Sequence, residues 1–139
     1  MNKFVILLII ILTSFSNYSQ SKSELYEIEK TLNYYLEGGT NNDFEMLSKA
    51  FHKNASMKFI SNNIYKEVNA IEFFKKIIKP GPRQNRKTKI TYIDINGFTA
   101  SSKIEIEYET MILTDYMNLL KIDGEWKIVS KIYNRSNKS

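Results

Sequence analysis

Residues 116–133 read YMNLLKIDGEWKIVSKIY. Two strand-like segments, residues 116–122 and 126–133, flank the pair Asp123-Gly124. Such a pair is typical of a two-residue β-hairpin turn, because both turn positions require a positive φ that Gly and Asp tolerate. The end of the chain therefore predicts two antiparallel strands.

Four segments upstream of this hairpin also have the composition of strands. Residues 102–109 alternate most clearly, with Ile or Tyr at positions 104, 106 and 108 and Lys or Glu at every odd position. Residues 89–96 alternate as well and end at the turn pair Asn96-Gly97. Residues 55–60 and 64–68 are two shorter segments separated by a polar turn. The sequence thus predicts six strands.

Helical spacing appears in the first half of the chain. In the first helix, apolar side chains recur at Leu25, Ile28, Leu32 and Tyr35. Ser21 and Glu24 have the spacing of a capping box at its start. Gly38-Gly39 is predicted to end this helix, since glycine accepts the left-handed conformation of a helix C-terminus.

Two shorter helices follow. Residues 41–43 cap the second, Asn69 caps the third, and Pro80 stops the third. The element order is then α-α-β-β-α-β-β-β-β, with helices gathered before most of the strands. This order predicts an α+β fold, with three helices packed on one face of a strongly curved antiparallel sheet.

The first 20 of the 139 residues have the three parts of a signal peptide. Lys3 supplies the basic region, residues 4–12 are uniformly apolar, and residues 13–20 are mostly small or polar. The apolar run is about half the length that a transmembrane helix needs. We therefore expect a signal peptide over residues 1–20, cleaved near Ser19 or Gln20, one folded domain over residues 21–133 and a disordered tail over residues 134–139. The expected location is secreted or periplasmic.

Composition excludes several classes of site. The chain has no cysteine, so it cannot be a lipoprotein and carries no thiol nucleophile. Its single histidine, His52, disfavours a histidine-based metal site. The sequence has no phosphate-binding loop, dinucleotide fingerprint, serine elbow or calcium loop. We expect neither a metal nor a tightly held cofactor.

Several stretches resemble one protein family. They are YLEG at 35–38, DFEML at 43–47, AFHKNA at 50–55 and the closing hairpin at 114–133. Together they resemble the "Putative lumazine-binding" family of the nuclear-transport-factor-two-like (NTF2-like) superfamily, over residues 26–133. The resemblance implies a cone-shaped fold with a pocket between helices and sheet, and a homodimer formed through the sheet. It does not fix an activity, because relatives include isomerases, cyclases, dehydratases and binding-only domains.

Two residues are candidates for general base. His52 follows the second helix, and an imidazole there could serve as a general base; a helix-end or solvated histidine is the alternative. Asp115 enters an apolar strand, where burial favours proton abstraction next to a carbonyl. The alternative for Asp115 is a structural ion pair with Lys131, because their strands are expected to be neighbours. Lys131 itself either meets an anionic ligand or lies solvated on the outer sheet face.

Aromatic side chains with polar tips suit a flat, mostly apolar ligand, although many of them serve as core. The residues expected to line a ligand pocket are Tyr35, His52, Met57, Phe59, Tyr65, Phe74, Tyr92, Tyr108, Asp115, Tyr116 and Lys131.

A basic run extends over residues 75–89, with seven cations and no acid. It is expected to form a solvated, mobile loop, or alternatively to contact phosphates or anionic lipid. Nucleic acid is not expected as a partner, because aromatic residues do not interleave with these cations.

The sequence therefore predicts an exported domain that binds a small apolar or aromatic molecule, forms a homodimer and has no stable membrane insertion after signal cleavage. One alternative is an isomerase-, cyclase- or dehydratase-type enzyme with Asp115 or His52 as base and Tyr35 or Tyr116 as oxyanion donor. The other is a dimerisation or interaction module, which predicts a large apolar outer sheet face and no cavity.

Overall fold

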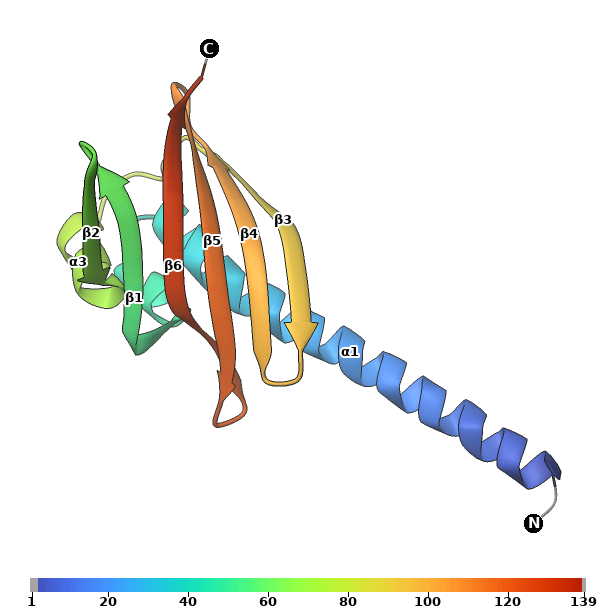
Figure 1. The fold of residues 1–139 in the computed structure, drawn as a ribbon. Helices are drawn as coiled ribbons and strands as arrows, with labels where there is room; N and C mark the ends of the chain where they lie inside the picture. Colours follow the sequence, from blue (N-terminus) through green and yellow to red (C-terminus); the bar gives the residue numbers. More distant parts are fainter. Residues whose placement is uncertain (1–2, 139) are drawn as a thin grey trace.

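The computed structural model describes the backbone of residues 3–138 and the side chains of residues 21–138. Within this range the chain has three helices and six strands (Figure 1). The helices are α1 Lys3–Thr40, α2 Phe44–Ser48 and α3 Ala70–Ile77. The strands are β1 Phe51–Ser61, β2 Ile64–Asn69, β3 Lys87–Asn96, β4 Thr99–Glu107, β5 Met111–Ile122 and β6 Glu125–Asn137. This order confirms the predicted α+β class and the sequence of elements.

The six strands form one sheet in the order β2-β1-β6-β5-β4-β3. Every neighbouring pair is antiparallel except β1 and β6, which run parallel. The sheet is thus mixed, and the prediction of an antiparallel sheet was wrong at this pair. Hairpin partners must be antiparallel, but β1 and β6 are distant in sequence, so their relative direction depends on the course of the chain between them.

The helices lie on one face of this sheet (Figure 1). A buried stripe of α1 packs on the sheet through Ile28 and Leu32, both with 0% exposure. The shorter α3 covers β1 and β2 and buries Phe74. The hydrophobic core therefore lies between helices and sheet, and the opposite sheet face is open.

Helix α1 begins before the predicted start. Ser21 and Glu24 lie inside it, so Ser21 is not its N-cap as the capping-box pattern predicted. The expected signal peptide, residues 1–20, lies outside the residues whose side chains the structure describes. In the described part of the chain, no helix combines the length and apolar character that a membrane span requires.

Gly38 and Gly39 do not end α1, which continues through Thr40. The left-handed residue after the helix is instead Asn42, with φ of 56°. Both glycines allow close packing. A Cβ at Gly38 would lie 2.7 Å from the Cα of Leu47 in α2, and a Cβ at Gly39 would collide with the guanidinium of Arg86.

The caps of the two short helices agree with the sequence. Asp43 Oδ1 accepts a 2.9 Å hydrogen bond from the Met46 N–H, and Asn69 Oδ1 accepts a 3.0 Å bond from the Glu72 N–H. Each side chain satisfies a backbone donor that has no partner within its helix.

Strands β5 and β6 extend further than predicted. Thr114 pairs with Asn134 and Met111 with Asn137, which continues the hairpin past residue 133. The expected disordered tail at residues 134–139 therefore differs from the structure, in which residues 134–137 belong to β6. Their polar composition suggested a tail, but backbone pairing does not depend on apolar side chains.

Candidate functional site

A cavity of about 330 Å³ lies between the helices and the sheet. Its walls come from all three helices, the segment before β3, the β4–β5 connection and strands β1, β5 and β6. The lining side chains are mostly apolar or aromatic, with a few polar groups among them. They belong to Tyr35, Gly39, Leu47, Met57, Phe73, Phe74, Ile77, Ile78, Gln84, Arg86, Tyr108, Met111, Leu113, Lys131, Tyr133 and Arg135.

A β-bulge directs Lys131 toward this cavity. Asn118 of β5 pairs with Ser130, but the next residue, Leu119, pairs with Ile128, so Val129 is the extra residue of β6. Simple alternation predicted that Lys131 and Ile128 lie on opposite faces. The extra residue shifts the alternation by one position, so both are buried on the helix side.

Lys131 forms a buried ion pair with Asp115 of β5. The Lys131 Nζ lies 3.0 Å from Asp115 Oδ1, and the two side chains are 4% and 0% exposed. The hydroxyl of Tyr35 in α1 donates a 2.7 Å hydrogen bond to the other carboxylate oxygen, Oδ2. The structural alternative for Asp115, a pair with Lys131, is therefore what the structure shows.

Aromatic rings surround the Lys131 ammonium on its other sides. Its nitrogen lies 4.5 Å from the ring centre of Tyr133, 5.3 Å from that of Tyr35 and 5.7 Å from that of Phe74. Cations are attracted to aromatic faces at such distances. The carboxylate and the rings together stabilise a charge that has been removed from water.

Burial shifts the pKa values of this cluster. It lowers the pKa of the Lys131 ammonium, and the Asp115 carboxylate acts in the opposite direction without cancelling the effect. Burial, followed by the nearby Asp115 charge and hydrogen bond, raises the pKa of the Tyr35 phenol well above 10.0. Burial also raises the pKa of Tyr133. The arrangement thus keeps both phenols protonated around one neutralised ion pair.

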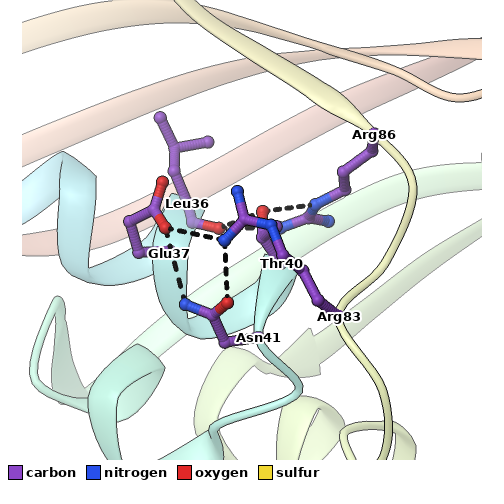
Figure 2. A network of polar contacts seen from close by, with 6 residues as sticks. All are labelled: Leu36, Glu37, Thr40, Asn41, Arg83 and Arg86. Atoms are coloured by element: carbon purple, nitrogen blue, oxygen red, sulfur yellow. Dashed lines mark hydrogen bonds and ion pairs between the residues drawn. The ribbon is translucent and has the colours of Figure 1, made fainter.

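Arg86, in the segment before β3, forms a second polar group of the cavity wall. Its Nε donates to Thr40 Oγ1 at 2.9 Å and one Nη2 N–H donates to the Leu36 carbonyl at 2.9 Å (Figure 2). One Nη1 N–H donates to the Tyr108 hydroxyl at 2.8 Å. These bonds attach the segment to the C-terminal end of α1, where backbone carbonyls have no partner inside the helix.

Two neighbouring residues hold the same end of α1. Gln84 Nε2 donates to the Gly39 carbonyl at 3.0 Å. Arg83 Nη1 donates to Asn41 Oδ1 at 2.9 Å (Figure 2). Arg83 also forms an ion pair with Glu37 at 3.6 Å. The expectation that the whole basic run is a solvated loop was therefore wrong for residues 83–86, because long-range hydrogen bonds to α1 fix them in place.

Of the eleven residues expected to line a pocket, five line this cavity: Tyr35, Met57, Phe74, Tyr108 and Lys131. Two more lie just behind it. Asp115 bonds to two of the lining side chains, and Phe59 stacks on the ring of Tyr133 with centroids 4.9 Å apart. These seven residues come from elements across the whole chain, and the fold brings them together.

The remaining four lie elsewhere. His52 is in β1 and its Nδ1 accepts a 3.2 Å hydrogen bond from the Asn54 N–H. Tyr65 is exposed on the edge strand β2. Tyr116 is on the open sheet face because it alternates with Asp115, and Tyr92 is exposed because the β3 register shifts between Ile90 and Tyr92.

Sequence reasoning missed Arg86, Gln84 and Tyr133 as lining residues. Tyr133 could have been found, since the same alternation that selects Lys131 also selects the residue two positions later. No local signal distinguishes Arg86 from the other cations of residues 75–89. Its partners in α1 are 46 and 50 positions away.

Among residues 21–138, no three His, Asp or Glu side chains come together as a possible metal site. The polar groups of the cavity are instead cations, hydroxyls and one amide. Such groups can donate hydrogen bonds and supply positive charge.

Comparison with known proteins shows which family the chain belongs to. The sequence profile of the family described as "Putative lumazine-binding" matches residues 23–134. The chain belongs to the "Putative lumazine-binding" family. This result confirms the resemblance seen in the sequence.

Solved structures show that the fold is NTF2-like. An NTF2-like protein of unknown function from Shewanella baltica is 30% identical, with a TM-score of 0.76 over 84% of this chain and 96% of that one. An NTF2-like protein of unknown function from Methylobacillus flagellatus is 29% identical, with a TM-score of 0.73 over 82% and 93%. A ketosteroid isomerase-like protein from Erwinia carotovora atroseptica shares the fold at 12% identity, with a TM-score of 0.65 over 81% and 95%. No match is found among the curated proteins.

Proposed function

We propose that this NTF2-like protein binds one small, largely apolar or aromatic molecule in the cavity between α3 and the sheet. The observation that carries the proposal is the cavity itself, about 330 Å³ in volume and lined mainly by apolar and aromatic side chains. Ligand sites are typically concave and apolar, with a few fixed polar groups. This volume is at the small end of such sites, so it suits a compact molecule of up to three rings.

The enzyme alternative receives less support from the geometry. It requires a base and an oxyanion donor that converge on one substrate position. Asp115 and Tyr35 bond to each other, and Lys131 occupies the other oxygen of Asp115. His52 and Tyr116 lie outside the cavity lining. The candidate bases, Asp115 and His52, and the candidate donors, Tyr35 and Tyr116, therefore do not converge on one substrate position. The geometry supports binding better than proton transfer.

The test uses a neutral fluorescent probe, N-phenyl-1-naphthylamine, with the purified chain. We expect a saturable increase in probe emission with one site per chain. Ile78→Trp should abolish the increase, because Ile78 lines the cavity and a larger side chain fills it. The matched control is Ile64→Trp, on an exposed position of β2. An increase that does not saturate, or that survives Ile78→Trp unchanged, would contradict the proposal.

We also propose that the chain forms a homodimer through the open sheet face. Tyr116 and Ile132 are directly paired neighbours there, and each is 50% exposed. Lys103 and Lys58 flank them in the same cross-strand row, and Glu67 follows Lys58. An apolar centre with both charge signs around it suits contact with a second, two-fold related copy. Tyr92 and Leu120 are also exposed on this face, but polar Lys103 and Asn118 separate them from the centre. The face is therefore not the continuous apolar surface that a pure interaction module predicts.

Sedimentation analysis tests the dimer. Tyr116→Asp should convert it to a monomer with an unchanged far-UV spectrum, because the charge would lie in the apolar centre of the contact. Tyr65→Asp, on an exposed tyrosine of the edge strand, is the control and should leave the dimer intact. A monomeric wild type would overturn this proposal and leave the cavity proposal standing.

Export completes the proposed role. An apolar run at residues 4–12 after Lys3 supports a signal peptide that is removed near Ser19 or Gln20. Intact-mass measurement of the chain produced in a secreting bacterial host should give a product shortened by about this length. A full-length mass in the cytoplasmic fraction alone would contradict it.

A further inference from the structure

The charged side chains that line the cavity are all cations. They are Arg86, Lys131 and Arg135, and no carboxylate is among the lining residues. Asp115, behind the wall, neutralises Lys131 through their 3.0 Å ion pair. Among residues 21–138, neither arginine forms an ion pair with a carboxylate. Glu107 and Glu109 line a neighbouring surface pocket together with Arg86, but neither forms an ion pair with it in the described chain. The cavity lining therefore has two cations, Arg86 and Arg135, without a carboxylate at ion-pair distance.

Arg86 is the more enclosed of these two arginines, since it is part-buried and Arg135 is exposed. A guanidinium has five N–H donors, and bonds to Thr40, Tyr108 and Leu36 use three of them. One N–H on each terminal nitrogen is left over. All three acceptors are uncharged, and the end of α1 adds only the partial negative charge of a helix C-terminus.

The positive charge of Arg86 also affects the buried cluster. It acts to lower the pKa values of both Lys131 and Tyr35. Gly39, directly against the guanidinium, has no side chain, so α1 leaves room for Arg86 at the wall. Arg86 is thus held in position in the cavity wall, with donor capacity left over.

We propose that the ligand of this cavity is an organic anion, and that Arg86 binds its carboxylate or equivalent acidic group while the apolar walls hold its ring system. This inference rests on the proposed function and specifies the ligand class. Arg86 supplies charge-assisted hydrogen bonds, which are stronger than those between neutral groups. Arg135, exposed where the cavity meets solvent, adds attraction for an approaching anion.

The test compares two probes of nearly the same size and shape, the anion 2-naphthoate and the neutral 2-naphthamide, in which an NH2 donor replaces one carboxylate oxygen. Both have the same ring system and a planar acceptor group. We expect 2-naphthoate to bind the wild-type chain at least tenfold more tightly by calorimetry, and its affinity to fall with added salt. This comparison needs no variant, so it does not depend on how a substitution affects folding.

Variants test whether the preference for 2-naphthoate comes from Arg86. Arg86→Gln should reduce the ratio of affinities to near one, mainly by weakening 2-naphthoate. Arg86→Lys should keep part of the preference, because it keeps the charge and loses the planar donor pair. Arg83→Gln is the matched control, since Arg83 is an exposed cation of the same segment that pairs with Glu37 and does not line the cavity. It should leave the ratio unchanged.

The outcomes separate the two proposals. Equal affinity for the two naphthalene probes, or tighter binding of 2-naphthamide, would overturn the anion inference while cavity binding stands. A preference that Arg83→Gln reduces as much as Arg86→Gln would also overturn the assignment to Arg86. Failure of N-phenyl-1-naphthylamine and of both naphthalene probes to bind would overturn both proposals.

Discussion

Lys131 of β6 and Asp115 of β5 form an ion pair of 3.0 Å in the wall between the core and the cavity, with both side chains almost fully buried. Removing two charges from water costs several kcal/mol for each ion, which mutual attraction offsets only when both partners are present. The pair therefore makes this wall sensitive to the loss of either charge.

Loss of one partner should be more harmful than loss of both. Asp115→Asn is expected to lower the free energy of unfolding by about 3 kcal/mol or more, because it leaves the buried Lys131 ammonium without a counter-ion. Lys131→Met should have a similar effect through the orphaned carboxylate. The double variant should recover most of the loss, as measured by urea denaturation.

A control for the pair is available on the sheet surface. Lys103 and Glu105 form an exposed ion pair of 3.7 Å, so Glu105→Gln should cost less than about 1 kcal/mol. Strictly additive effects of Asp115→Asn and Lys131→Met would show that the two charges are not coupled.

The raised pKa of Tyr35 predicts a loss of stability at high pH. The unfolded chain releases the Tyr35 proton near pH 10, and the folded chain holds it to higher pH. The contribution of Tyr35 to stability is therefore complete below pH 10 and is lost as pH rises through its pKa in the folded chain. The stability advantage of wild type over Tyr35→Phe should shrink above pH 10, by about 1.4 kcal/mol per pH unit.

Chemical denaturation between pH 8 and pH 11.5 measures this difference. Tyr92→Phe, at an exposed tyrosine, is the control and should show a pH-independent difference from wild type. If wild type and Tyr35→Phe differ by the same free energy of unfolding at every pH in this range, the ionisation of Tyr35 does not contribute to stability as predicted.

Gly38 is predicted to be irreplaceable for packing reasons. An alanine in place of glycine normally stabilises a helix by about 1 kcal/mol. At Gly38 the new Cβ would lie 2.7 Å from the Leu47 Cα, so α1 and α2 must separate. Gly38→Ala should therefore destabilise the chain by about 1–3 kcal/mol.

Thermal unfolding measures the stability of Gly38→Ala. The control is Asn33→Ala, at an exposed position of the same helix. That control changes helix propensity alone and should be neutral or slightly stabilising. If Gly38→Ala and Asn33→Ala raised the unfolding temperature equally, α2 would not pack on Gly38 as described.

The fluorescence of Trp126, the single tryptophan, should report the protonation of Glu24. Trp126 Nε1 donates a 2.7 Å hydrogen bond to Glu24 Oε2, and Lys121 bonds to the other carboxylate oxygen. These two hydrogen bonds, that from Lys121 first, lower the pKa of Glu24 below 4.5. Its contribution to stability is thus present above pH 4.5 and is lost as pH falls through the folded pKa.

Trp126 emission should therefore stay constant down to pH 4.5 and change only at lower pH. Glu24→Gln should remove this transition, while far-UV circular dichroism shows whether the fold persists. A midpoint at or above pH 4.5 would be inconsistent with the bond between Trp126 and Glu24.

Local sequence patterns determined the elements of this protein. The Asp123-Gly124 pair fixed the closing hairpin, and the side chains of Asp43 and Asn69 fixed the starts of α2 and α3, because each of these effects acts within a few residues. The expected pairing of the last two strands also brought Asp115 within reach of Lys131, although adjacent Tyr116, expected in the same pocket, lies on the other face.

Only the tertiary structure decided the direction of β1 against β6, the inward orientation of Lys131 and the place of Arg86 in the cavity wall. A parallel pair depends on the path of the chain between its strands, and one extra residue at Val129 reverses every later side chain in β6. The contacts of Arg86 reach 46 and 50 residues back to the end of α1. No pattern confined to neighbouring residues contains that information, because it arises from long-range packing.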